Sequence, residues 1–151
     1  MKRIVYVDMD GVLCDFENAV DRARKTDPDE LYPHSAAGFY RSLMPLPGAL
    51  EAMDRMLSSP DLDLYILTAP SVYNPLCYTE KRLWVEDHLG FEMTKRLIIS
   101  PDKSLLNGDV LIDDNVNGHG QDRFGGTLVQ FGSEVYPNWK SILTSLLGNA
   151  C

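Results

Sequence analysis

The sequence has few cysteines and no long apolar run. Its three cysteines, Cys14, Cys77 and Cys151, lie far apart and form no CxxC pair. This spacing indicates neither a disulfide framework nor a zinc site, so a reducing compartment is the simpler expectation. The apolar run before Asp8 is too short for a signal peptide core or a membrane span. We therefore expect a cytoplasmic protein.

Basic residues are also scarce relative to acidic ones. The 14 Lys and Arg residues stand against 22 Asp and Glu residues, which gives a net charge of -8. A surface of this charge repels nucleic-acid polymers and anionic membranes, so we expect neither as a partner. A small anionic substrate is still compatible with this negative charge if a divalent metal or local cations make the electrostatic potential at its binding site positive. The composition does not indicate the oligomeric state, and a homodimer is an open alternative.

Internal repeats, low-complexity segments and long linkers are absent from the sequence. Its 151 residues fit one domain, and a hydrophobic fraction of 44% excludes wholesale disorder. Helical spacing predicts helices over residues 15–25, 36–43, 48–58, 80–89 and 139–147, and apolar runs predict strands over 4–7, 62–67, 96–100, 110–112 and 127–131. This alternation predicts an α/β fold with a parallel sheet flanked by helices.

The region between the first strand and the next long helix has its own character. Two short helical patterns and turn-forming residues fill it, and Met44-Pro45-Leu46-Pro47-Gly48 ends it with a stiff, extended connection. We therefore expect residues 14–45 to form a small helical insertion after the first strand. Residues 1–13 and 46–151 then form the core.

Polar residues of one kind follow three of the predicted strands. Asp8 and Asp10 end the first, Thr68 ends the second, and Asp113-Asp114 ends a later one, with Lys103 on a loop between. The carboxyl ends of parallel strands meet at one edge of a sheet, where ligands bind in such folds. Taken singly, each residue also fits an exposed turn or a strand end. Together they favour a single site.

Clustered carboxylates repel one another unless a cation lies among them. Mg²⁺, which prefers oxygen ligands, suits such a cluster. Threonine and lysine suit an anion bound beside the metal, such as a phosphoryl group. One carboxylate can then attack phosphorus to give an aspartyl-phosphate, while another moves the proton.

These motifs resemble those of the haloacid dehalogenase (HAD) superfamily of phosphatases, in the same order along the chain. More narrowly, the sequence is similar to the 5'(3')-deoxyribonucleotidases, and the similarity extends from residue 8 to residue 143. The stretches that carry it are Asp10-Gly11-Val12-Leu13-Cys14-Asp15-Phe16, Pro45-Leu46-Pro47-Gly48-Ala49, Trp84-Val85-Glu86, Asp102-Lys103-Ser104, Leu111-Ile112-Asp113-Asp114 and Trp139-Lys140-Ser141-Ile142-Leu143.

The resemblance implies a HAD-like fold and a role for each motif residue. Asp8 is expected to be the nucleophile and Asp10 the acid/base. Mg²⁺ is expected to bind Asp8, the backbone carbonyl of Asp10, and Asp114, with Asp113 as a supporting acid, although the sequence leaves open which of the last two contacts the metal. Thr68 and Lys103 are expected to bind phosphate. The insertion 14–45 corresponds to a cap, and Phe16 to a position that packs on the base.

Two departures from the family affect these expectations. Ala69 replaces a frequent serine, which removes one hydroxyl donor to phosphate, although the Ala69 backbone N–H can still donate. The insertion is short and has no tryptophan, so base stacking falls to Phe16, with Phe39 or Tyr40 as open candidates.

The leading prediction is a Mg²⁺-dependent phosphomonoesterase for nucleoside monophosphates, with deoxynucleotides favoured. A HAD phosphatase for another small phosphorylated metabolite is the first alternative. A receiver-like signalling module is a second, but there the phosphorylated aspartate ends the third strand rather than the first. A silent binding protein on the same fold is a third. The sequence does not indicate the base, the sugar or the position of the phosphate.

Overall fold

The computed structural model describes residues 1–148, and Cys151 lies outside them. Within them the chain forms a five-stranded sheet in the order β3-β2-β1-β4-β5. All four neighbouring pairs of strands are parallel. The strands are β1 (Arg3–Val7), β2 (Leu62–Thr68), β3 (Leu97–Ile99), β4 (Val110–Asp113) and β5 (Thr127–Gln130). The predicted parallel α/β fold is confirmed.

Four of the described helices match predicted ones with small shifts at their ends, and a short helix after residue 90 was not predicted. The described helices are α1 (Phe16–Thr26), α2 (Ala49–Leu57), α3 (Cys77–Leu89), α4 (Phe91–Thr94) and α5 (Trp139–Leu147), with three short 3-10 helices, η1 (Pro33–Ser35), η2 (Lys103–Leu105) and η3 (Gln121–Arg123). The bounds of α5 match the prediction because local chemistry fixes its start. Asn138 and Ser141 cap each other's backbone N–H groups in a capping box.

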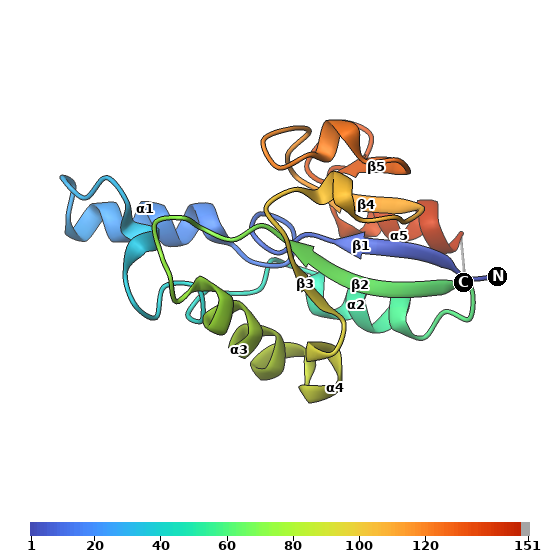
Figure 1. Ribbon diagram of the computed structural model, residues 1–151, viewed down its shortest axis with the longest axis horizontal. Helices are drawn as coiled ribbons and strands as arrows, with labels where there is room; N and C mark the ends of the chain where they lie inside the picture. The colour runs from blue at the N-terminus through green and yellow to red at the C-terminus, as the bar shows by residue number, and fades with distance from the viewer. Residues whose placement is uncertain (149–151) are drawn as a thin grey trace.

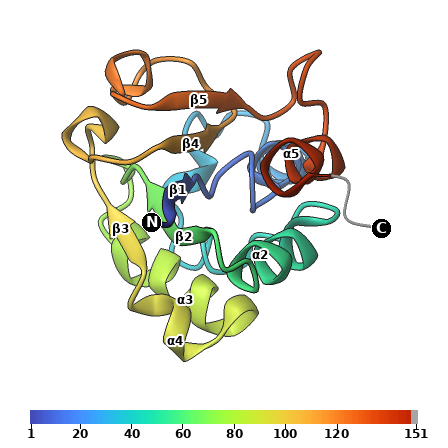
Figure 2. The same ribbon diagram turned by 90° about the vertical axis from the view of Figure 1, so that its right-hand side faces the viewer.

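The two faces of the sheet are covered differently. Side chains alternate along β1, so Val5 and Val7 join the main core while Tyr6 faces the opposite way. The main core includes buried residues of α2, α3 and α5, and Figure 2 shows α2 and α5 side by side on one face. The other face packs against Leu106 and Phe124, which follow η2 and η3.

The helix predicted over residues 36–43 is wrong. This segment forms successive turns in which Gly38 has a φ of +86°, outside the helical region. The buried carboxylate of Glu80 in α3 accepts hydrogen bonds from the backbone N–H groups of Gly38, Tyr40 and Arg41, at 3.0, 3.0 and 3.4 Å. Tertiary contacts therefore satisfy the N–H groups that a helix would have paired internally.

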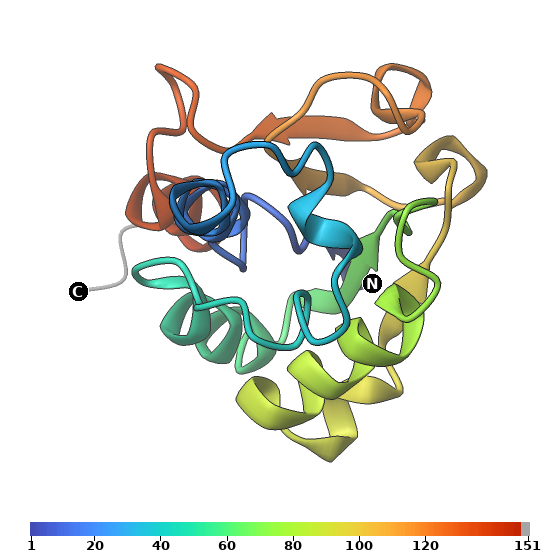
Figure 3. The same ribbon diagram turned by 90° about the vertical axis from the view of Figure 1, so that its left-hand side faces the viewer.

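The segment 14–45 leaves and rejoins the rest of the chain at one point. Cys14 and Pro45 form an antiparallel bridge, and the N–H of Asp15 donates to the carbonyl of Met44 at 2.8 Å. Figure 1 shows α1 beyond the carboxyl ends of the strands, and Figure 3 shows the rest of the segment, coloured blue to cyan, across the same end. Whether 14–45 acts as a separate cap stays a prediction.

A membrane crossing would need a long, apolar helix, and residues 1–148 contain none that meets both requirements.

Candidate active site

The sheet register brings the acidic residues together. Asp8 directly follows β1, and Asp113 ends β4, which pairs with β1 through Val7 and Ile112. The N–H of Asp8 continues this pairing, since it donates to the carbonyl of Ile112 at 2.9 Å. Thr68 ends β2 on the other side of β1. The predicted convergence of these strand ends is therefore present.

A tight turn after β1 places Asp10 beside the same edge. The carbonyl of Met9 accepts the N–H groups of three following residues, Val12, Leu13 and Cys14, at 2.8 to 3.1 Å. Gly11 has a φ of +82°, and a Cβ atom there would lie 2.1 Å from Oδ2 of Asp114. Only glycine fits, because of both the backbone conformation and this close approach.

Lys103 links two of the acids from η2. Its Nζ donates to Oδ1 of Asp8 at 2.9 Å and to Oδ2 of Asp113 at 2.5 Å. Burial alone would lower the pKa of Lys103, but the carboxylates of Asp8 and Asp113 more than offset this and raise it. The lysine therefore stays a fixed positive charge among the acids.

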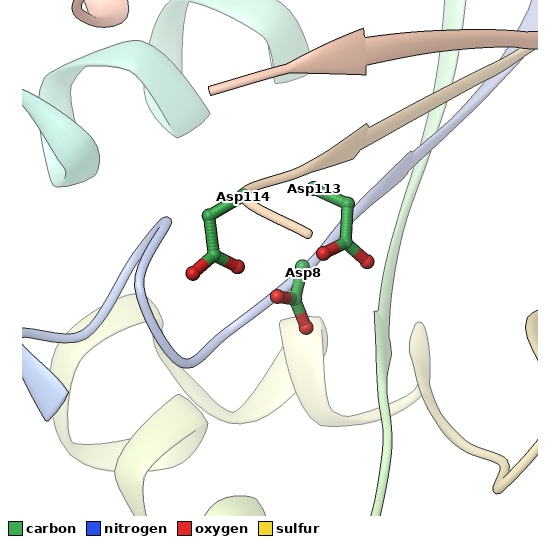
Figure 4. Close-up of side chains that lie close together, drawn as sticks. All are labelled: Asp8, Asp113 and Asp114. Atoms are coloured by element: carbon green, nitrogen blue, oxygen red, sulfur yellow. The ribbon is translucent and has the colours of Figure 1, made fainter. Parts of the chain in front are cut away.

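The carboxyl groups of Asp8, Asp113 and Asp114 converge, as Figure 4 shows. Each offers an oxygen within 4.8 Å of the others. Burial raises the pKa of Asp8 well above its usual value; Lys103 opposes the rise, and the neighbouring carboxylates add to it. Burial also raises the pKa of Asp114. A cation among these groups would favour their charged forms.

The donor set fits a hard cation such as Mg²⁺. Oδ1 of Asp114 is buried and has no hydrogen-bond partner within residues 1–148. Asp113 differs, since its Oδ1 accepts the N–H of Asn115 at 3.0 Å and its Oδ2 binds Lys103. Asp114 therefore has a free ligand oxygen where Asp113 has protein partners, which favours Asp114 as the metal ligand and Asp113 as its support.

A cavity of about 510 Å³ opens over this cluster. The polar residues that line it include Asp8, Asp10, Asp114, Thr68, Ala69 and Lys103, and we call this set of residues its charged end. Phe16 and Tyr40, from the segment 14–45, also line it and belong to what we call its aromatic end, whereas Phe39 is not among the described residues that line it. The cavity thus brings together Asp8, Asp10, Thr68, Lys103 and Asp114, while the predicted supporting acid Asp113 is fully buried and is not among the described residues that line it. Of the two open aromatic candidates, Tyr40 lines the cavity and Phe39 does not.

The aromatic end includes residues that sequence reasoning missed. His34 and Tyr73 line the cavity, and the ring of His34 lies 5.8 Å from that of Phe16. The rings of Tyr32 and Tyr73 stack with centroids 4.3 Å apart, which joins the segment 14–45 to the loop after β2. No pattern in the sequence marks these residues, because a short 3-10 helix and turns carry them instead of α-helices or strands.

Gln121 and His119 also line the cavity from the loop after β4. The side-chain oxygen of Gln121 accepts the N–H of His119 at 2.8 Å. Neither residue was among those predicted for the site.

Lys81 is a further residue that sequence reasoning missed. It is buried in α3, and its Nζ contacts Asp10 and Thr68. A signal was present, because helical spacing places Lys81 on the same face as Cys77, Trp84 and Val85, which is the buried face of α3.

Comparison with known proteins identifies relatives over most of the chain. The sequence model of the family "5' nucleotidase, deoxy (Pyrimidine), cytosolic type C protein" matches residues 23–135. A Vibrio phage KVP40 protein provisionally named a 5'(3')-deoxyribonucleotidase is 38% identical over 96% of this chain and 85% of its own length. The human cytosolic-type 5'(3')-deoxyribonucleotidase is 34% identical over 96% of this chain and 81% of its own length.

Solved structures show the same fold at low sequence identity. The HAD hydrolase YfnB of Bacillus subtilis, solved with bound magnesium, superposes with a TM-score of 0.68 at 12% identity and 99% coverage of both chains. A HAD-superfamily hydrolase of Geobacter sulfurreducens superposes with a TM-score of 0.58 at 14% identity, over 97% of this chain and 100% of its own. These similarities confirm the HAD-like fold. The chain belongs to the 5'(3')-deoxyribonucleotidase family, whose members are hydrolases named for their action on phosphoric monoesters.

Proposed function

We propose that this protein is a Mg²⁺-dependent phosphomonoesterase that dephosphorylates deoxynucleoside monophosphates through an aspartyl-phosphate. The observation that carries the proposal is the cavity at the carboxyl edge of the sheet, which Asp8, Asp10, Thr68 and Lys103 line together in a chain of this family. An aromatic end and a charged end suit a ligand with a base and a phosphate. The cavity volume, about 510 Å³, is in the range of small-molecule sites.

Asp8 is the proposed nucleophile. Its carboxylate attacks phosphorus, the bond from phosphorus to the ester oxygen breaks, and the phosphoryl group is carried on Asp8. Lys103, 2.9 Å from Oδ1 of Asp8, holds the carboxylate in place. A water molecule then attacks phosphorus, releases phosphate and restores Asp8.

Asp10 is the proposed acid/base. It gives a proton to the leaving ester oxygen in the first step and accepts one from the attacking water in the second. Its position two residues after Asp8, on the turn that Gly11 permits, puts both carboxyl groups on the lining of one cavity.

Asp8, the backbone carbonyl of Asp10, and Asp114 are the proposed Mg²⁺ ligands. When bound there, the metal would supply positive charge that offsets the negative charge of the carboxylates and of the phosphoryl oxygens. The unpartnered Oδ1 of Asp114 supports this assignment.

Thr68, the backbone N–H of Ala69, and Lys103 are the proposed donors to the phosphoryl oxygens. All three residues line the charged end of the cavity. The segment 14–45 is proposed to act as a cap over the nucleoside, with Phe16 packing on the base and Tyr40 beside it. A cytoplasmic location and the oligomeric state, a homodimer included, stay predictions.

A panel of phosphomonoesters tests the proposal. Phosphate release is measured with Mg²⁺ for deoxynucleotides, ribonucleotides and sugar phosphates, each with the phosphate at different positions. We expect the highest kcat/KM for deoxynucleoside monophosphates. A strong preference for sugar phosphates over every nucleotide would overturn the substrate assignment and favour the metabolite-phosphatase alternative.

A further inference from the structure

Lys81 makes three polar contacts in the wall of the candidate active site. Its Nζ lies 3.2 Å from Oδ2 of Asp10, 2.6 Å from Oγ1 of Thr68 and 2.6 Å from the carbonyl oxygen of Ala69. The lysine is 1% exposed. An ammonium group has three N–H donors and no acceptor, so these contacts use its full hydrogen-bonding capacity. A buried lysine this fully paired is a built feature of the site, because an unpaired one would be strongly unfavourable.

Lys81 and Lys103 both contact residues of the candidate active site, but they differ in their access to the cavity. Lys103 lines the cavity, where a phosphoryl group can contact it. Lys81 is not among the described residues that line the cavity, and it lies behind Asp10 and Thr68, which do. Lys81 therefore acts on the reaction through the cavity-lining residues that it contacts, which are Asp10, Thr68 and Ala69.

The contacts of Lys81 orient both partners. Because the ammonium group donates to Oδ2 of Asp10, a proton on this carboxyl group is held by Oδ1, which has no partner within residues 1–148. Because Thr68 accepts from Lys81, its hydroxyl hydrogen points away from the lysine, and it donates over a long 3.5 Å to the carbonyl oxygen of Ala69. Lys81 thus anchors one oxygen of the Asp10 carboxyl group and keeps the Thr68 hydroxyl as a donor.

Glu80, the residue before Lys81, connects α3 to the segment 14–45. Glu80 binds three backbone N–H groups of the turn around Tyr40, and Nζ of Lys81 lies 5.2 Å from the centre of the Tyr40 ring. Consecutive residues of α3 therefore bind the proposed cap and the proposed acid/base.

We propose that Lys81 is a positioning residue that holds the carboxyl group of Asp10 in the orientation for proton transfer to the leaving oxygen. The proposal rests on the proposed function, since it gives Lys81 a part in the same reaction. It predicts that replacing Lys81 lowers kcat more for substrates whose leaving group needs a proton than for substrates whose leaving group does not. A nucleoside oxygen leaves poorly without one, whereas p-nitrophenolate is stable as an anion.

The test compares the two leaving groups in Lys81→Met, which keeps the length of the side chain and removes its charge. We expect kcat for a deoxynucleoside monophosphate to fall on the order of 10²-fold, within the range for lost general acid catalysis, and kcat for p-nitrophenyl phosphate to fall much less. The ratio of the two rates is measured within one preparation, so it does not depend on the folded fraction. If Lys81→Met does not fold, Lys81→Gln is measured in the same way.

Two further variants separate positioning from general damage. Arg82→Met, which removes an exposed cation from the same helix, should leave the ratio unchanged. Adding Lys81→Met to Asp10→Asn should cost little more than Asp10→Asn alone, because both changes disable one step. Equal losses for both leaving groups, or additive losses in the double variant, would overturn the proposal.

The test of Lys81 does not require that the substrate is a nucleotide. If the wild type hydrolyses a sugar phosphate and no nucleotide, the proposed substrate is wrong, and the sugar phosphate replaces the nucleotide in the same ratio. An unchanged ratio in Lys81→Met then overturns only the role of Lys81.

Discussion

The two ends of the cavity are built in different ways. At the charged end, Asp8, Thr68 and Asp114 end or directly follow strands of one sheet, so the register of the sheet fixes their relative positions. At the aromatic end, Phe16 begins α1, while His34 and Tyr40 lie in the short 3-10 helix and turns that follow.

This difference assigns the chemical step of the proposed reaction to the charged end and the selection of the substrate to the aromatic end. The chemical step needs groups held at fixed distances, which paired strands supply. Selection of the substrate depends on contacts made by turns and loops, which tolerate changes in length and sequence more readily. Related chains can therefore keep the charged end while their aromatic ends differ.

The largest expected effect comes from Asp8→Asn, at the charged end. An amide cannot attack phosphorus, so we expect turnover to be abolished for every phosphomonoester. Phosphate release by repurified protein is the measurement, with the exposed Asp54→Asn on α2 as the matched control. Substantial activity in Asp8→Asn would exclude Asp8 as the nucleophile.

Asp10→Asn should have the next largest effect. We expect nucleotide turnover to fall on the order of 10² to 10⁴-fold, as is typical when a proton donor is lost. Steady-state kinetics give the value, and p-nitrophenyl phosphate should suffer less because its leaving group needs no proton. An unchanged rate for nucleotides would move the acid/base role to another group.

Mg²⁺ binding at the charged end can be measured without turnover. A ligand that binds only the folded state stabilises it by about 2.7 kcal/mol at a free concentration about 100 times Kd. We expect Mg²⁺ to raise the Tm of the wild type, and Asp114→Asn, which removes the negative charge of the carboxylate with the unpartnered oxygen, to abolish most of this rise. A full Mg²⁺-dependent rise in Asp114→Asn would remove Asp114 from the ligand set.

The charged end could be predicted from the sequence because its signals are local. An apolar strand followed by acids, repeated along the chain, leads directly to the edge of a parallel sheet. Lys103 has no local signal of its own, because it lies in a loop, and it was included because it lies between two of these strands and suits a bound anion. Lys81 was missed, although its position on the buried face of α3 could have revealed it.

The aromatic end could not be predicted to the same depth. The apolar spacing of residues 36–43 suggested a helix, but Glu80, distant in sequence, binds the N–H groups of this segment and holds it in turns. Contacts of this kind depend on the folded chain and leave no periodic pattern. The same reason explains why His34 and Tyr73 were not foreseen.

A smaller effect is expected from Phe16→Leu, at the aromatic end. Base stacking on an aromatic ring is worth about 1–3 kcal/mol, so this variant should lose that amount in kcat/KM for nucleotides. The loss should be absent for glycerol phosphate, which has no base. Equal losses for both substrates would show that Phe16 supports the structure instead of the base.

The smallest effect on selection is expected from Phe39→Leu, the matched control. Phe39 contacts Phe16 with ring centroids 5.6 Å apart, yet it does not line the described cavity. We expect a loss of stability below about 1.5 kcal/mol, measured by denaturant unfolding, and no change in the preference for nucleotides. A changed preference would place Phe39 at the substrate.

The most direct test of the central claim is the stereochemical course at phosphorus. The substrate is a nucleoside monophosphate whose phosphorus is made chiral with oxygen isotopes and sulfur. Transfer to Asp8 followed by attack of water inverts the phosphorus twice, so we predict net retention of configuration. Net inversion would mean that water attacks the substrate directly, and it would contradict the assignment of Asp8 as the nucleophile.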